Sequence, residues 1–310
     1  MNVLITGSSG QIGTNVGLAA RARGDQVTGV DIRPNTWTHS LNTVSLDLAK
    51  ASVGDLPDGP FDVVLHFAAH AKVFELVERP ERAMENIRML FTVLDYCRQR
   101  RVPLIFASSR EVYGDIHRHV TDEDAADFVV AESPYSASKI AGEALIYSYA
   151  QCYKLPFLVF RFSNVYGRYD NDLERMERVI PLFVDRIARG LPIVVYGRNK
   201  VLDFTYVDDC VAGILAGMDA LAAGMVVGQT INLAYGHGNT LVDVVNIVSL
   251  ALGAEPKVTY QPSRVGEVTR YVADIRKARE LLSYDPQVPL SSGLIRCVEW
   301  SREWHARQRG

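Results

Sequence analysis

Residues 1–13 decide the fold, and they read MNVLITGSSGQIG. The apolar run at residues 3–5 has the character of a buried strand, and Gly7, Gly10 and Gly13 follow it. Glycines at such a turn let the backbone approach a pyrophosphate closely, and the amide dipoles of the next helix then point at the phosphates. The spacing differs from Gly-x-Gly-x-x-Gly and alone also fits an ordinary tight turn. Its place between a strand and a helix predicts a dinucleotide-binding turn.

Short apolar runs alternate with helical patterns through the first half of the chain. The expected strands are residues 3–5, 27–30, 63–67, 104–106 and 157–160, and the clearest expected helices are residues 81–101 and 135–154. This alternation predicts an α/β fold, a Rossmann-like doubly wound parallel sheet with a smaller C-terminal substrate-binding lobe. We expect the NAD-binding domain at residues 1–164, with a returning segment at about 195–235. Residues 165–310 mostly form the interleaved second lobe, and the acidic residues 115–133 form a surface loop.

Composition limits the classes of partner. The 310 residues carry a net charge of −3, which gives no electrostatic reason to expect a nucleic acid or a membrane. No apolar run reaches the roughly eighteen residues that a membrane helix requires. The four cysteines lie far apart, so neither zinc nor a disulfide framework is expected. We therefore expect buried thiols, no metal site and a cytoplasmic protein.

Asp31 ends the second expected strand, eighteen residues after Gly13. A carboxylate at that point accepts hydrogen bonds from the ribose hydroxyls of NAD and repels a 2′-phosphate. Arg33 nearby weakens this preference for NAD, and the alternative is a solvated loop aspartate. The further expected cofactor contacts are Gln11, Ile12, Arg33, Asp47, Leu48, Phe67, Ala68, Ala69, Asn86 and Phe162.

Tyr135 and Lys139 are four residues apart in an expected helix, so their side chains share one face. An ammonium group beside a phenol stabilises the phenolate, and a positively charged nicotinamide adds to that effect. Tyr135 then becomes a usable base near neutral pH. Ser109 ends another expected strand. It is placed to bond the same substrate hydroxyl group from which Tyr135 would take the proton. Packing explains most isolated Tyr-x-x-x-Lys pairs, and an isolated serine there is more often a turn residue, but together the three predict a catalytic set.

With these motifs in place, the chain resembles the extended short-chain dehydrogenases/reductases of the NAD-dependent epimerase/dehydratase family. The matching segments are residues 7–13, 66–69, 108–114, 135–139, 161–167, 203–209 and 264–267, together with Asn86. The resemblance implies a nucleotide-sugar substrate whose diphosphate contacts Asn164 and Arg264, with Glu267 near its ribose. It also implies a homodimer formed by the two long helices. Arg178, Val179 and Tyr196 are further expected substrate contacts.

Members of this family share a first step and then diverge. The resemblance implies that Tyr135 takes the proton of the sugar 4-hydroxyl while hydride passes from C4 to NAD, which gives a 4-keto sugar. A 4-epimerase then returns the hydride to the other face of the sugar. A 4,6-dehydratase expels the 6-hydroxyl, and a decarboxylase releases carbon dioxide from a 6-carboxylate.

The two residues after Ser109 bear on this choice. The 4,6-dehydratases that resemble this chain have Asp and Glu there, whereas this chain has Arg110 and Glu111. Arginine does not deliver a proton at neutral pH, so ordinary dehydration lacks its general acid. Uronate decarboxylases that resemble the family also have a glutamate at the position of Glu111. An ion pair with Arg110 or another arginine explains it equally well.

Arginines between Asn164 and Pro181 favour an acidic sugar. Arg168, Arg175 and Arg178 stand where simple hexose epimerases tend to have proline and glycine, and a guanidinium clamps a carboxylate with two parallel hydrogen bonds. The alternative is that they only cover a helix beside neighbouring acidic residues. Leu202 stands where relatives usually have an arginine that contacts the diphosphate, so the identity of the nucleotide is less firmly predicted. Arg198, Lys200 or Arg264 could supply the positive charge instead.

The sequence therefore predicts an NAD-dependent nucleoside-diphosphate-sugar 4-epimerase. The expected substrate is a UDP-hexuronate, with UDP-glucuronate converted to UDP-galacturonate, or else a UDP-hexose. A UDP-glucuronate decarboxylase is the second choice and a dehydratase the third. A non-catalytic NAD-sensing protein on the same fold is the alternative of a different class, and the set Ser109, Tyr135 and Lys139 counts against it.

Overall fold

The computed structural model describes residues 1–113, 131–171, 173 and 178–309, with the side chains of residues 307–309 left out. Most of the expected loop at residues 115–133 lies outside this part of the chain. Arg175 lies outside it too.

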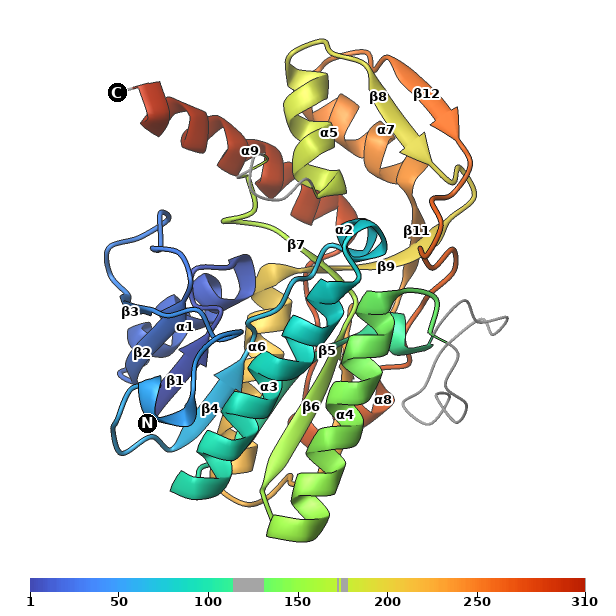
Figure 1. Ribbon diagram of the computed structural model, residues 1–310. Coiled ribbons are helices and arrows are strands. Elements are labelled where there is room, and N and C mark those ends of the chain that lie inside the picture. Colours follow the sequence, from blue (N-terminus) through green and yellow to red (C-terminus); the bar gives the residue numbers. More distant parts are fainter. Residues whose placement is uncertain (114–130, 172, 174–177, 310) are drawn as a thin grey trace.

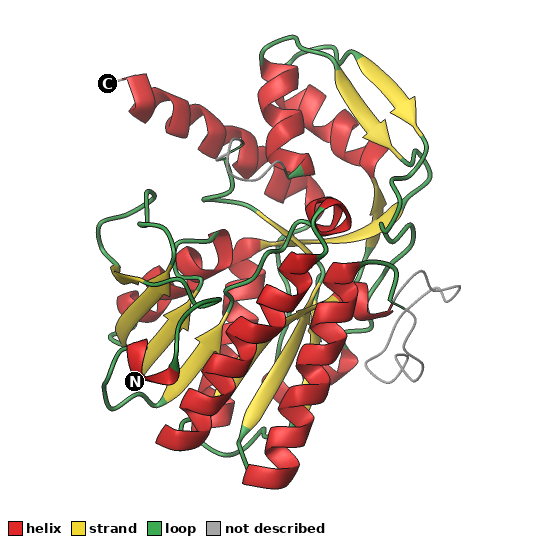
Figure 2. Ribbon diagram, viewed as in Figure 1, coloured by secondary structure: helices red, strands yellow, loops and turns green. Residues whose placement is uncertain are grey.

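The larger lobe is built on a seven-stranded parallel sheet (Figures 1 and 2). Its strands, in spatial order, are β10 (Gln229–Leu233), β6 (Phe157–Phe162), β5 (Leu104–Ser109), β4 (Val63–His66), β1 (Asn2–Thr6), β2 (Gln26–Asp31) and β3 (Asn42–Ser45). The strand order reverses direction beside β1, as in doubly wound folds. The α/β fold class and all five expected strands are thus confirmed, with small differences at their ends.

Helices cover both faces of this sheet. The helices α3 (Glu81–Arg100) and α4 (Pro134–Tyr153) pack together on one face. The helices α1 (Gln11–Ala22) and α6 (Val207–Ala222) pack together on the other. Successive strand residues alternate between the two faces: Val3 and Ile5 belong to the core beneath α1 and α6, whereas Leu4 belongs to the core beneath α3. The apolar runs are continuous because both faces are buried.

The smaller lobe contains two short sheets and most of the remaining helices. A three-stranded sheet joins β7 (Asn164–Tyr166), β9 (Val201–Tyr206) and β11 (Gly238–Thr240), and β8 (Ile193–Tyr196) pairs with β12 (Val258–Gln261). The other elements are η1 (Val53–Asp55), α2 (Val73–Glu78), η2 (Arg110–Tyr113), α5 (Val179–Ala188), α7 (Leu241–Leu252), α8 (Arg276–Leu282) and α9 (Leu290–Arg309). Within the span expected to return to the first domain, α6 and β10 pack in the larger lobe, whereas β8 and β9 belong to the small sheets.

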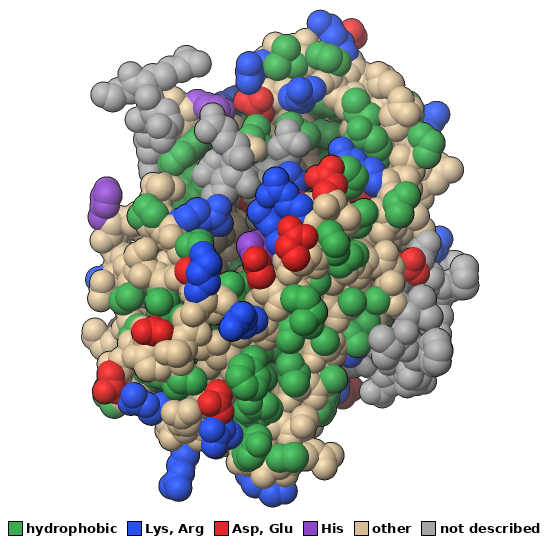
Figure 3. All heavy atoms as spheres, in the orientation of Figure 1, with side chains coloured by type: hydrophobic (Ala, Val, Ile, Leu, Met, Phe, Trp, Pro, Cys, Tyr) green, Lys and Arg blue, Asp and Glu red, His purple; other side chains and the backbone are tan. Residues whose placement is uncertain are grey.

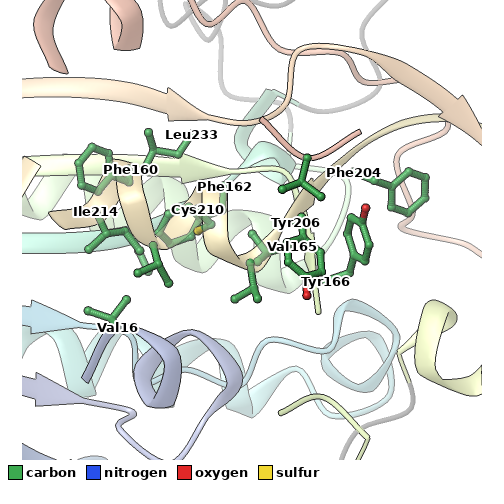
Figure 4. Packing of buried hydrophobic residues seen from close by; sticks show 14 of the residues in the cluster. Val16, Phe160, Phe162, Val165, Tyr166, Phe204, Tyr206, Cys210, Ile214 and Leu233 are labelled. Atoms are coloured by element: carbon green, nitrogen blue, oxygen red, sulfur yellow. The ribbon is translucent and has the colours of Figure 1, made fainter. Parts of the chain in front are cut away.

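One apolar core joins the two lobes. Phe160 and Ile214, in the larger lobe, belong to the same buried cluster as Tyr166 and Phe204, in the smaller one (Figure 4). This shared core fixes the position of the strand ends at the junction, where the cavity described below lies. Within the described residues, no helix combines the length and apolar character needed to cross a bilayer.

Candidate active site

A cavity of about 1070 Å³ lies at the carboxyl ends of the parallel strands. On the face shown in Figure 3, charged side chains gather around a hollow between the two lobes. Sequence-predicted residues that line the cavity are Gly7, Gly10, Gln11, Ile12, Gly13, Asp31, Arg33, Asp47, Leu48, Phe67, Ala68, Ala69, Ser109, Arg110, Glu111, Tyr135, Lys139, Phe162, Asn164, Arg178 and Val179. The fold therefore brings most of the predicted site to one place.

The glycine turn joins β1 to α1 at one wall of the cavity. Gly7 has a positive φ of 75°, and a Cβ atom there would lie 2.6 Å from the backbone nitrogen of Ala68. A Cβ atom on Gly13 would lie 2.2 Å from the carbonyl oxygen of Gly7. Any larger residue at these positions would displace the backbone. The glycines therefore let the turn pack closely against Ala68 and against the first turn of α1, at the wall of the cavity.

Asp31 lies at the end of β2, next to this turn. Its two carboxylate oxygens accept hydrogen bonds from the backbone nitrogens of Ser9, at 3.0 Å, and Arg33, at 3.1 Å. The carboxylate is thus buried and held in one orientation at the cavity wall. This geometry, together with the glycine turn, fits the adenosine half of NAD.

Tyr135 lies in the first turn of α4. Ser133 caps this helix by accepting a hydrogen bond from the backbone nitrogen of Ser136 at 3.1 Å, and Pro134 occupies its first position. Ser109, at the end of β5, lines the cavity beside Tyr135 and lowers the pKa of that phenol against the larger effect of burial. The Nζ atom of Lys139 lies 5.7 Å from the centroid of the Tyr135 ring. Three side chains from two elements therefore converge at the cavity.

The pKa of Tyr135 differs from the prediction that the neighbouring ammonium group makes this phenol more acidic. Burial raises the pKa of Tyr135 to about 12, although the hydrogen bond from Ser109 and the positive charges of Arg178 and Arg110 act in the opposite direction. Burial also lowers the pKa of Lys139 to about 8. The Nζ atom of Lys139 donates to the carbonyl oxygen of Ala107 at 2.8 Å. The lysine is thus fixed beside the phenol, but burial dominates, so the pKa of Tyr135 is raised and not lowered as predicted.

Arg110 and Glu111 form a buried ion pair of 2.9 Å beside the triad. Burial raises the pKa of Glu111, and the charge of Arg110 opposes this rise. Glu111 therefore forms the ion pair with Arg110 that was the alternative interpretation of this residue. Glu111 nevertheless lines the cavity, and its Oε2 atom has no hydrogen-bond partner among the described residues.

The arginines of the expected clamp separate into two groups. Arg178 lines the cavity, where its Nη1 atom donates to Gln11 Oε1 at 2.8 Å and its Nε atom lies 3.4 Å from the Asp170 carboxylate. Arg168 instead pairs with Asp208 at 2.6 Å and does not line the cavity. Of the described arginines in this segment, only Arg178 lines the cavity.

Four predicted contact residues do not line this cavity. Asn86 uses its side-chain amide on the backbone of His70, at 2.8 and 3.1 Å, and on Ser138 Oγ at 3.2 Å. Because both of its amide atoms are engaged, it orders the cavity wall rather than facing the cavity. The guanidinium of Arg264 stacks on Tyr196 at 4.0 Å from the ring centroid, and Glu267 pairs with Lys200. Leu202 is buried in the core.

Glu143 is a buried site residue that the sequence analysis missed. It lies one turn beyond Lys139 on α4 and forms an ion pair of 2.7 Å with Arg161 on β6. Ser108 also donates a hydrogen bond to it. Its negative charge raises the pKa of Lys139 against the effect of burial. The signal was present in the sequence, since a glutamate four residues after Lys139 must share its helical face.

The polar groups of the cavity suit a dinucleotide. Among the described residues, no group of three or more His, Cys, Asp or Glu side chains is placed to hold a metal ion. The glycine turn and Asp31 instead provide space for phosphates and an acceptor for ribose hydroxyls.

Comparison with known proteins agrees with this site. Residues 3–234 match the model of the NAD dependent epimerase/dehydratase family. UDP-glucuronate 4-epimerase 1 of Arabidopsis thaliana is 32% identical, over 97% of this chain and 76% of its own. A crystal structure of UDP-glucose 4-epimerase from Thermotoga maritima with UDP-glucose has a TM-score of 0.88 at 28% identity, covering 98% of this chain and 100% of that one. MoeE5 in complex with UDP-glucuronic acid and NAD has a TM-score of 0.87 at 29% identity, with the same coverage. The chain therefore belongs to the NAD dependent epimerase/dehydratase family.

Proposed function

We propose that the protein is an NAD-dependent nucleoside-diphosphate-sugar 4-epimerase that interconverts UDP-glucuronate and UDP-galacturonate. The observation that carries this proposal is the convergence of Ser109, Tyr135 and Lys139 on the cavity that also contains the glycine turn. The similarity to UDP-glucuronate 4-epimerase 1 supports both the reaction and the acidic sugar, and the similarity to MoeE5, solved with UDP-glucuronic acid and with UDP-glucose, supports a UDP-sugar bound beside NAD.

Bound NAD would supply the hydride acceptor for the sugar C4 atom. Ser109 and Tyr135 bind the 4-hydroxyl, and the Tyr135 oxygen accepts its proton as the carbinol becomes a ketone. Burial opposes the phenolate form of Tyr135, and the nearby charges of Arg178 and Arg110 favour it. Lys139 provides a further positive charge beside the ring. After the ketone turns over in the cavity, hydride would return to the other face of C4, and Tyr135 gives its proton to the C4 oxygen, which completes the inverted alcohol.

The proposed contacts of the cofactor are the glycine turn, Gln11, Ile12, Asp31 and Arg33. The other proposed cofactor contacts are Asp47, Leu48, Phe67, Ala68, Ala69 and Phe162, all of which line the same cavity. Asn86 acts indirectly, by ordering His70 and Ser138.

The proposed contacts of the nucleotide sugar lie mainly on the smaller lobe. Asn164 and Val179 line the cavity, and Asn164 is held by a hydrogen bond of 2.9 Å to the carbonyl oxygen of Asp203. The stacked pair of Arg264 and Tyr196, with Glu267, is proposed for the nucleotide end. Those three side chains would reach the ligand from outside the main cavity.

Arg178 is the proposed partner of the substrate carboxylate. It is held at the cavity wall between Gln11 and Asp170, and this fixed orientation suits bidentate recognition. The test is a comparison of kcat/KM for UDP-glucuronate and UDP-glucose, in the wild type and in Arg178→Met. We expect the wild type to prefer the uronate and the variant to lose that preference. A wild-type preference for the neutral sugar would exclude the proposed contact of Arg178 with a substrate carboxylate and would indicate a UDP-hexose 4-epimerase.

Decarboxylation of UDP-glucuronate is the second candidate, because Glu111 lines the cavity with one carboxylate oxygen unpartnered among the described residues. Dehydration is disfavoured, since Arg110 occupies the position of the general acid and is paired with Glu111. Measuring carbon dioxide release from UDP-glucuronate separates the decarboxylase from the epimerase.

We further propose a homodimer formed through α3 and α4, working in the cytoplasm. Hydrophobic side chains gather over these two helices in Figure 3, and Met84, Phe91 and Tyr153 are 66%, 52% and 56% exposed. The cysteines are free thiols, as in a reducing compartment. Analytical ultracentrifugation should give twice the chain mass for the wild type and the single chain mass for Phe91→Glu. Leu250→Glu, at an apolar residue on α7 that is more exposed still, at 83%, should remain dimeric.

A further inference from the structure

All three tryptophans of the chain meet in one cluster. Trp37 comes from the segment between β2 and β3, and Trp300 and Trp304 come from α9. The centroids of Trp37 and Trp304 are 4.7 Å apart, and those of Trp300 and Trp304 are 6.2 Å apart. Tyr169, which follows β7, completes the cluster at 5.9 Å from Trp37 and 5.1 Å from Trp300. We call these four residues the aromatic cluster; Figure 1 shows the β2–β3 segment and the end of α9 on the same side of the molecule.

Tyr169 is held in an unfavourable backbone conformation. Its φ of 61° lies in the left-handed region, which a residue with a large side chain rarely adopts. Such a conformation persists only where surrounding contacts impose it, and the aromatic cluster provides those contacts. The turn directs the two neighbours of Tyr169 toward the larger lobe. Asn15 donates to the carbonyl oxygen of Arg168 at 3.3 Å, and Asp170 lines the cavity beside Arg178.

Trp37 is tied to the glycine turn by Asn35. The side-chain amide nitrogen of Asn35 donates to the carbonyl oxygen of Ser8 at 3.2 Å and to Thr14 Oγ1 at 2.9 Å. Its amide oxygen accepts a hydrogen bond from the backbone nitrogen of Trp37 at 3.0 Å. The ring of Trp37 is therefore placed by the same turn that forms the phosphate cradle.

These contacts form a closed circuit that begins and ends at the glycine turn, which lines the cavity. From Ser8 the circuit runs through Asn35 and Trp37 to Tyr169 and then to Asp170. Its last links are the ion pair of Asp170 with Arg178, at 3.4 Å, and the hydrogen bond from Arg178 to Gln11, at 2.8 Å. Neither Trp37 nor Tyr169 lines the cavity, so each acts on the groove only through its neighbours.

We propose that the aromatic cluster slows release of the dinucleotide, so that the cofactor stays in the cavity between the two hydride transfers. The inference rests on the proposed function, because a 4-epimerase must retain the reduced cofactor while the ketone turns over. Trp37 and Tyr169 are then positioning residues. Their removal breaks the circuit between Asn35 and Asp170, and the cofactor leaves faster.

The test measures release of NAD from the purified holoenzyme, by passing it repeatedly through a desalting column and assaying the cofactor that remains. Trp37→Ala and Tyr169→Ala each remove two ring contacts, and release should become about tenfold faster or more. Trp37→Phe and Tyr169→Phe keep an aromatic ring and should stay close to the wild-type rate. Tyr169→Gly relieves the left-handed backbone but lacks the ring, so it should behave like Tyr169→Ala.

Unaltered retention in the alanine and glycine variants would overturn the proposal. Circular dichroism melting identifies any variant that does not fold; if Trp37→Ala is one, Tyr169→Gly and Trp304→Ala decide the question. The proposed function can fail separately. If the wild type retains NAD and the variants release it, but no sugar is inverted, then the cluster stands and the epimerase assignment falls.

Discussion

The ammonium group of Lys139 lies 5.7 Å from the centroid of the Tyr135 ring and is fixed there by a hydrogen bond of 2.8 Å to the carbonyl oxygen of Ala107. The strand that supplies Ala107 also supplies Ser109, which lowers the pKa of Tyr135 against the effect of burial. One strand therefore positions both side chains that lie beside the phenol.

Replacing Tyr135 by Phe removes only the hydroxyl group. Because that oxygen is the proposed proton acceptor, kcat should fall by about 10²- to 10⁴-fold. The bound NAD and the melting temperature should stay close to wild type, since the ring remains packed. Full activity in Tyr135→Phe would instead favour an NAD-sensing role or a different base.

The pH dependence should report Lys139. Burial lowers its pKa to about 8, so its positive charge is lost as the pH rises through that value and the phenolate loses its support. We expect kcat to fall on the alkaline side near pH 8. Lys139→Arg carries a charge that does not titrate in this range, so any activity it retains should show no such fall. An unchanged alkaline limb in Lys139→Arg would assign the titration to another group.

Glu143→Gln should affect both stability and pH dependence. The change leaves the buried guanidinium of Arg161 facing a neutral amide, and breaking a buried ion pair costs about 3–5 kcal/mol of unfolding free energy. It also removes the negative charge that raises the pKa of Lys139, so the alkaline fall in kcat should move to lower pH. Denaturant unfolding measures the first effect and the pH profile the second. A loss of stability with an unmoved pH profile would limit Glu143 to a structural role.

Gly13→Ala should abolish cofactor binding, because the new Cβ atom would lie 2.2 Å from the carbonyl oxygen of Gly7. Gly54→Ala is the matched control, since the nearest atom to its Cβ would be 4.0 Å away. The NAD content after purification should fall only in Gly13→Ala. Equal NAD contents in the two variants would exclude the glycine turn as the phosphate cradle.

The sequence predicted the fold and most of the site because both depend on local patterns. Doubly buried strands read as continuous apolar runs, and the glycine turn, Asp31 and Ser109 follow directly from strand ends. The predicted residues that lie outside the cavity have positions that depend on long-range packing. Asn86 turns its amide to His70 and Ser138, and Arg168 finds Asp208 on α6, pairings that no local spacing specifies. The burial that raises the pKa of Tyr135 is likewise a property of the assembled lobes.

The central claim is that hydride leaves C4 of a nucleotide sugar and returns to the same carbon on the other face. The most direct test is NMR analysis of products after incubation with UDP-glucuronate deuterated at C4. The account predicts UDP-galacturonate that retains deuterium at C4, with no carbon dioxide released. A pentose product with carbon dioxide, or a uronate whose C4 configuration never changes, would contradict it.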